Sequence, residues 1–103
     1  MRNFRDDILT AVEGEEILAV RIDGAINYWR FDPESDPRDV AVKPFYGRIC
    51  TWEEINSALD YQYDAGFGAM DCHDIKLWTP TKVFFIHEYD GSTSIISEFR
   101  NPT

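Results

Sequence analysis

The stretch KVFFIHEYDGSTSIISEF, residues 82–99, decides the fold. Two runs rich in β-branched and aromatic residues flank Asp90-Gly91, a dipeptide that favours a two-residue turn because both positions need positive φ. The pattern therefore predicts a β-hairpin. Residues 83–86 are all apolar, so we expect this strand to be central, with a helix on one face and a further layer, such as a partner, on the other.

A second dipeptide of the same kind, Asp23-Gly24, predicts another hairpin between residues 17–22 and 25–31. Pairing across this turn places Val20 opposite Asn27. Residues 40–50 are expected to hold an edge strand that Pro44 and Gly47 interrupt.

Two helices are predicted. Residues 4–13 have apolar side chains at helical spacing, with acids near the start and Gly14 as a stop. Thr51 and Glu54 form a capping-box pattern, and Gly66 is expected to end the helix that begins there. This second helix is expected to be the main one.

Together these elements predict an α+β fold: one antiparallel sheet of four to six strands, built from two hairpins, with one main packed helix and a short N-terminal helix. At 103 residues, the chain has enough length for one hydrophobic core, so residues 1–103 are expected to form a single domain.

The composition is acidic. Nineteen acidic residues against ten basic ones give a formal net charge of −9. Phosphate backbones and anionic lipids repel such a chain, which argues against direct nucleic-acid or membrane binding, whereas a protein with a basic surface is attracted. The two cysteines do not make a disulfide scaffold, and no N-terminal apolar segment is present, so we expect a cytoplasmic protein with reduced thiols.

Asp71, Cys72, His73 and Asp74 are four consecutive residues with reactive or metal-binding side chains. A cysteine nucleophile needs a base within hydrogen-bond reach, and neighbours in an extended chain point to opposite sides, so His87 is the more plausible base for Cys72. The alternative is structural: buried cysteines, His73 as a surface or loop-capping residue, and aspartates that accept hydrogen bonds from backbone N–H groups. We favour the structural interpretation and predict no catalytic residue.

A metal site is the third alternative for this segment. Cys50, Cys72, His73 and His87 supply a zinc-type ligand set, but their spacing lacks the close pairs that wrap a short loop around an ion. Asp71 with the two histidines could form an iron-binding face, for which the chain has little volume to enclose. We therefore predict no metal and no cofactor.

The function we expect is that of a small, acidic, non-catalytic binding or inhibitor protein that docks carboxylates on the basic groove of a nucleic-acid-handling protein, as a nucleic-acid mimic, an anti-defence protein or an immunity protein does. On the predicted second helix, Glu53, Asp60 and Asp64 share one face, and Tyr61 is a candidate aromatic anchor. An exposed acidic loop is expected to add four more carboxylates, those of Asp32, Glu34, Asp36 and Asp39.

The alternative is a nucleotide- or small-molecule-binding homo-oligomer. Its pocket would lie at a subunit boundary and combine Tyr and Trp side chains with Arg30, Arg48 or Lys76. A second subunit would then cover the apolar strand at 83–86, making a homodimer. A hydrolase that uses Cys72 or His87 is the third class, and it is the least favoured.

Overall fold

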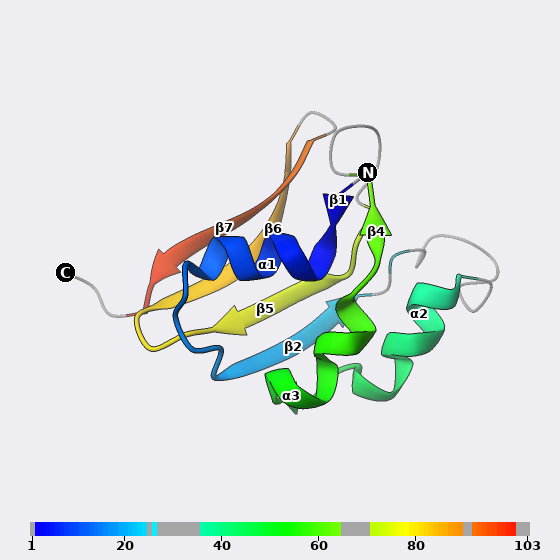
Figure 1. Cartoon of the computed structure of the whole chain (residues 1–103), viewed down its shortest axis with the longest axis horizontal. Helices are drawn as coiled ribbons and strands as arrows, with labels where there is room; N and C mark the ends of the chain where they lie inside the picture. Colours follow the sequence, from blue (N-terminus) through cyan, green and yellow to red (C-terminus); the bar gives the residue numbers. More distant parts are fainter. Residues whose placement is uncertain (1, 25, 27–35, 65–70, 90–91, 101–103) are drawn as a thin grey trace.

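The computed structural model in Figure 1 describes residues 2–24, 26, 36–64, 71–89 and 92–100. Its central feature is a five-stranded antiparallel sheet in the order β3-β2-β5-β6-β7. The five strands are β2 (Ala19–Gly24), β3 (Ile49–Cys50), β5 (Asp74–Trp78), β6 (Lys82–Tyr89) and β7 (Ser92–Phe99). The mixture of helices with an antiparallel sheet agrees with the predicted α+β class.

Five short helices and a small ribbon complete the described structure. The ribbon pairs β1 (Arg2–Asn3) with β4 (Gln62–Tyr63). The helices are α1 (Phe4–Val12), α2 (Pro37–Val42), the 3₁₀ helix η2 (Lys43–Phe45), α3 (Trp52–Ile55) and the 3₁₀ helix η3 (Asn56–Leu59). In the part of the chain that is described, no helix combines the length and the apolar character needed to cross a membrane.

The hairpin predicted for residues 82–99 is confirmed. β6 and β7 pair along their whole length, from Lys82 opposite Phe99 to Tyr89 opposite Ser92. The turn residues 90–91 lie outside the described residues. β6 is also central, because β5 pairs with its other side.

The register predicted for the first hairpin is wrong. Val20 pairs with Cys50 of β3 on one side and with Leu77 of β5 on the other, so neither edge of the strand is open at this residue. Asn27, its predicted partner, lies outside the described residues, as do residues 28–31. A strand has only two hydrogen-bonding edges, and distant strands fill both of them here.

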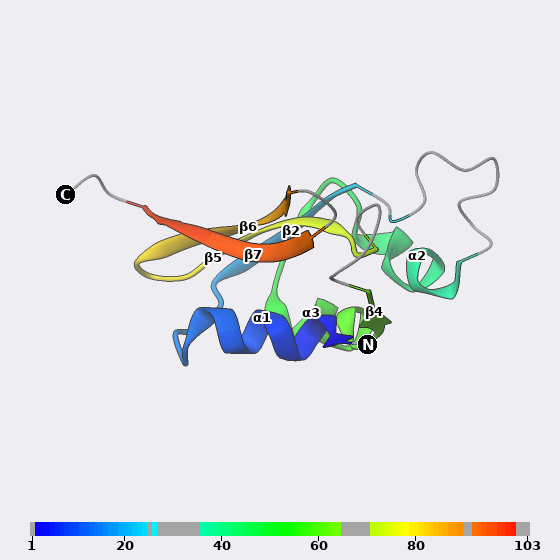
Figure 2. The same cartoon turned by 90° about the horizontal axis from the view of Figure 1, so that it is seen from above.

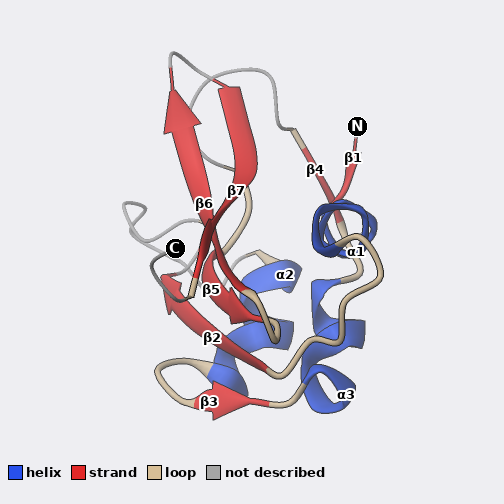
Figure 3. Ribbon diagram, turned by 90° about the vertical axis from the view of Figure 1, so that its left-hand side faces the viewer, coloured by secondary structure: helices blue, strands red, loops and turns tan. Residues whose placement is uncertain are grey.

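The helices α1 and α3 lie on one side of the sheet (Figures 2 and 3). Between these two layers is the core, in which Phe4 and Ile8 of α1 and Ile55 of α3 are at most 1% exposed. The opposing strands contribute Val20, Ile22, Ile75, Leu77 and Phe84 to the same cluster. The short N-terminal helix, predicted from the spacing of its apolar residues, is therefore confirmed.

The main helix is shorter than predicted. Thr51 and Glu54 do form the capping box, but helical structure ends at Leu59 and the chain re-enters an extended conformation. Tyr63 then pairs with Arg2 in the β1–β4 ribbon and is 2% exposed. Burial of this aromatic side chain against Phe4 outweighs the weak helical preference of the segment.

Residues 37–42 are helical, where the sequence predicts an acidic loop followed by an edge strand. Asp36 caps α2 through the backbone N–H of Arg38, and Pro37 occupies the first turn, where its missing N–H costs nothing. The edge strand itself is confirmed only at β3, Ile49–Cys50.

Candidate functional site

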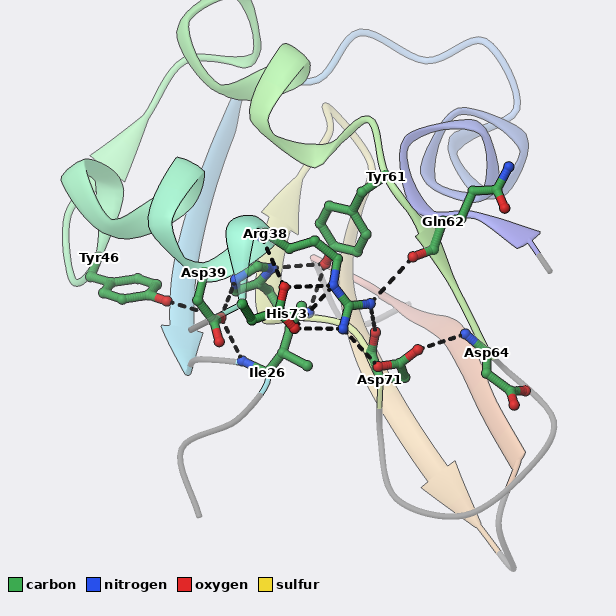
Figure 4. Close-up of polar contacts among 10 residues, drawn as sticks. Ile26, Arg38, Asp39, Tyr46, Tyr61, Gln62, Asp64, Asp71 and His73 are labelled. Carbon is green, nitrogen blue, oxygen red and sulfur yellow. Dashed lines mark hydrogen bonds and ion pairs between the residues drawn. The ribbon is translucent and has the colours of Figure 1, made fainter. Parts of the chain in front are cut away.

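Arg38 is the centre of a polar network that connects α2 with residues 62 and 71 (Figure 4). Its guanidinium donates to both carboxylate oxygens of Asp36 and, at 3.0 Å, to Oδ1 of Asp71. It also donates to the backbone carbonyl groups of Gln62 and Asp71. With five donors in a fixed planar arrangement, arginine is suited to such a junction. Arg38 therefore holds together three segments that are far apart in the sequence.

A second chain of contacts runs through the completely buried ring of His73. The hydroxyl of Tyr61 accepts a hydrogen bond from the backbone N–H of His73 and lies 2.8 Å from Nδ1 of the ring. Because Nε2 faces a carboxylate oxygen of Asp39, the neutral ring carries its proton on Nε2, and Nδ1 accepts the hydroxyl proton of Tyr61. Nε2 lies 2.8 Å from Oδ1 of Asp39, although its N–H is not well aligned with the oxygen.

Asp39 is 4% exposed and receives two further hydrogen bonds. The backbone N–H of Ile26 donates to Oδ1 at 2.9 Å, and the hydroxyl of Tyr46 donates to the same oxygen at 3.3 Å. A buried carboxylate of this kind is stable only when neighbouring donors compensate for the loss of water. The prediction that Asp39 belongs to an exposed acidic loop is wrong.

Burial shifts the pKa values of the titratable groups in this region. It lowers the pKa of His73 to about 4, against the opposing effect of Asp39, so the imidazole is neutral at pH 7. Burial also raises the pKa of Cys72 to about 12, helped by Asp71 and Asp74. The pKa of Tyr61 is raised for the same reason.

Tyr61, His73 and Asp39 resemble a proton relay in composition, but the imidazole ring between the other two is closed to solvent. His73 and Cys72 are both 0% exposed, and the Cys72 thiol is protonated. A cysteine nucleophile needs an accessible thiolate. The network is suited instead to fixing α2 against residues 71–73. The expectation that His73 lies at the surface is wrong. Buried cysteines are confirmed, and so is an Asp71 that accepts a hydrogen bond from a backbone N–H, that of Asp64.

The carboxylates predicted to form one acidic face are dispersed. Asp60 and Asp64 follow the end of η3, so they do not share a helix face with Glu53, which is exposed in the first turn of α3. Asp60 is engaged by Arg5 at 3.2 Å and by Asn3 at 2.8 Å. The helical stripe predicted from the sequence is therefore wrong.

The remaining residues of that predicted surface do not form an exposed group within the described chain. Asp36 is bound by Arg38, and Tyr61 packs against the core with the Arg38 guanidinium 5.4 Å from its ring centre. Tyr61 is therefore not the exposed anchor that was expected. Asp32 and Glu34 lie outside the described residues, as does Arg30 of the alternative pocket.

The face of the sheet opposite the helices carries a second group of apolar side chains. We call it the open face, because no helix or strand of the described chain lies over it (Figures 2 and 3). Cross-strand partners place its side chains in two rows. The first is Ala19, Trp78, Val83 and Glu98, and the second is Ile49, Arg21, Lys76, Phe85 and Ile96.

The apolar centre of the open face consists of Trp78, Val83, Phe85 and Ile96, all partly exposed. Their neighbours Ile86 and Ile95 point the other way and pack against the core. Ile49, at the edge of the sheet, is 58% exposed. The apolar character of residues 83–86 indicated this second face, whereas Trp78 and Ile96 become part of it only through strand pairing.

No metal site is seen among the described residues. No group of three or more His, Cys, Asp and Glu side chains there is arranged to hold a metal ion. A hollow of about 230 Å³ lies between α1, β4 and β7, but Arg2 at its margin is already paired with Asp7. Of the arginine and lysine proposed for a ligand pocket, Arg48 is paired with Glu54, and Lys76 lies on the open face.

Comparison with known proteins gives no relative from which a role could be transferred. No protein-family model, no curated protein and no solved structure matches this chain.

Proposed function

We propose that this chain is a small, non-catalytic binding protein whose contact surface for a protein partner is the open face of its sheet. The observation that carries the proposal is the unequal covering of the two sheet faces. Helices bury one face, whereas Trp78, Val83, Phe85 and Ile96 form an apolar centre on the other with no described element above it. Contiguous apolar surface of this kind, bordered by charged residues, is typical of protein interaction sites.

The composition of the open face supports the same conclusion. Aromatic residues contribute a large share of binding energy at protein interfaces, and two of the four central side chains are aromatic. Arg21 lies with its guanidinium 5.7 Å from the ring centre of Trp78 and also binds Asp23. The apolar centre therefore has a polar border, which excludes water from a contact once it forms.

The experiment compares what the wild-type chain captures from native cells with what two variants capture. Phe85→Glu places a charge in the centre of the open face, and Leu9→Glu places one on α1, where Leu9 is 44% exposed. We expect Phe85→Glu to lose the captured partner and Leu9→Glu to retain it. Urea unfolding of both variants checks that each remains folded. Equal capture by all three proteins would contradict the proposal.

A second candidate is the docking of acidic side chains on a protein with a basic surface. Four exposed acids on the helix side of the molecule and in its connecting segments support this candidate. They have no ion pair within the described chain: Asp6, Glu13, Glu16 and Glu53. Such a surface attracts a basic partner over long distances, and this attraction is screened by salt.

The test of this second candidate is a triple variant, Glu13→Gln, Glu16→Gln and Glu53→Gln. We expect it to weaken capture of a basic partner at low salt, with Glu98→Gln on the open face as the control. Capture that is unchanged in the triple variant, or that is insensitive to salt, would contradict acidic docking without affecting the proposal for the open face.

A further inference from the structure

We propose that the partner on the open face is a second copy of this chain, and that two sheets pack face to face in a symmetric dimer. This inference rests on the proposed function and names the partner of the same surface. Three observations lead to it: the size of the face, its local charge, and the arrangement of charges across its strands.

The size of the open face favours a partner that is itself a sheet. The five strands contain 29 residues in all, each rising about 3.3 Å along strands spaced about 4.8 Å apart. This gives a flat area of about 460 Å², to which side-chain relief adds, whereas a stable interface buries about 800 Å² on each partner. Nearly the whole face must therefore be covered, and a second sheet of the same width does this by aligned packing.

The local charge of the open face permits contact between two copies. The strand pairing and the Arg21–Asp23 ion pair place two cations, Arg21 and Lys76, and three carboxylates, Asp23, Asp74 and Glu98, on this face. Two against three gives −1, compared with −9 for the whole chain. The acids are therefore concentrated elsewhere, and self-contact through this face avoids most of the like-charge repulsion.

The arrangement of these charges favours one symmetry. Both cations lie on β2 and β5, together with Asp23 and Asp74, whereas Glu98 is alone on β7, at the opposite edge. A two-fold axis along the strands, between β5 and β6, places β2 of one copy over β7 of the other. Arg21 then faces Ile96 of the second copy and lies near Glu98, two residues further along the same strand.

The same rotation places β5 over β6. Trp78 of each copy then meets Val83 of the other, and Lys76 meets the ring of Phe85. A two-fold axis across the strands would instead place each strand over its own equivalent, so that β7 would face β7 and Glu98 would lie away from both cations. Only the axis along the strands brings Glu98 close to a cation of the other copy, so it is favoured. Each contact occurs twice, as a two-fold interface requires.

Sedimentation equilibrium of the full chain tests the inference. We expect a species of twice the 12.0 kDa chain mass at concentrations up to about 100 μM, corresponding to a dissociation constant in the micromolar range. Because both copies are acidic overall, added salt should strengthen the dimer. Phe85→Ser should raise the dissociation constant at least about tenfold, as loss of a central interface residue does.

A charge exchange tests the predicted symmetry. Arg21→Glu and Glu98→Arg should each weaken the dimer, and the double variant should recover affinity to within about threefold of the wild type, because the opposite charges face each other again. Leu9→Ser on α1 serves as the control and should leave the dissociation constant unchanged.

Two results would overturn the inference. One is a single-copy mass at every concentration. The other is a dimer that persists in Phe85→Ser and in Arg21→Glu, since it would then form through another surface, such as the outer edge of β7. If the chain is monomeric and Phe85→Glu still abolishes capture of a different protein, the inference fails while the proposed function stands. If no capture depends on Phe85 and the chain is monomeric, both fail.

Discussion

Nε2 of His73 lies 2.8 Å from Oδ1 of Asp39, and both side chains are almost inaccessible to solvent. On the other side of the ring, Tyr61 donates its hydroxyl proton to Nδ1. The imidazole is thus held as a neutral group between a donor and an acceptor. This arrangement has a measurable consequence for stability, because the unfolded chain binds a proton at a higher pH than the folded chain does.

Stability should fall as the pH falls from 7 to 5. The pKa of His73 is about 4 in the folded protein, below its ordinary value of 6.5, because burial disfavours the imidazolium. Between pH 4 and pH 6.5 the unfolded state binds one more proton than the folded state does. The contribution of His73 to the free energy of unfolding is therefore complete above pH 6.5 and is lost as the pH approaches 4. We expect the free energy of unfolding to decrease by about 2 kcal/mol between pH 7 and pH 5.

Urea unfolding at a series of pH values measures this change, and His87→Gln is the matched control because it removes the other histidine and leaves the buried one. The NMR titration of the His73 ring gives a second readout, with an expected midpoint near pH 4. A midpoint above 6 would show that the ring is not held neutral by its surroundings.

Removal of the Arg38 guanidinium should destabilise the protein substantially. In Arg38→Met the carboxylates of Asp36 and Asp71 lose their shared cation, and two backbone carbonyl groups lose a donor. The side chain is 22% exposed, so we expect a loss of about 2 to 4 kcal/mol, somewhat below the cost of breaking a fully buried pair.

Arg2→Met provides the matched comparison in the same unfolding experiment. Arg2 also pairs with an aspartate, Asp7, but its side chain is 64% exposed. Exposed pairs contribute less than about 1 kcal/mol. Equal losses in the two variants would show that Arg38 is not a structural junction.

The two native thiols should be unreactive in the folded protein. Cys72 and Cys50 are 0% and 2% exposed, and burial raises the pKa of both, that of Cys72 to about 12. A thiol reagent at pH 8 should modify them only as fast as the protein unfolds, and at once in urea. Leu9→Cys, at an exposed position of α1, is the control and should react immediately. Rapid modification of Cys72 in the folded wild type would contradict this expectation and favour a cysteine nucleophile.

Local sequence signals predicted the elements that local chemistry determines. The Asp90-Gly91 dipeptide correctly indicated the β6–β7 hairpin, and Thr51 with Glu54 correctly marked the start of α3. Asp36-Pro37, a capping residue followed by the residue best suited to a first helical turn, marks the start of α2 equally well, although the prolines, the acids and the lack of apolar residues around it favour a loop.

Long-range contacts determined the rest. β2 pairs with β3 and β5, which come later in the chain than the segment directly after Asp23-Gly24, and no local pattern specifies such partners. The end of η3 is set by the pairing of β4 with β1, which lies some 60 residues earlier in the chain. The burial of His73 depends in the same way on Asp39 and Tyr61, which come from other segments.

Site-specific photo-cross-linking in the native cell shows whether another protein surface covers the open face. A photoreactive phenylalanine analogue is placed at residue 85, in the centre of that face, or at residue 9 on α1 as the control. We expect a discrete cross-linked product from residue 85, at twice the chain mass if the partner is a second copy, and none of that mass from residue 9. If residue 85 gives no discrete product in a protein that remains folded, the open face is not a contact surface.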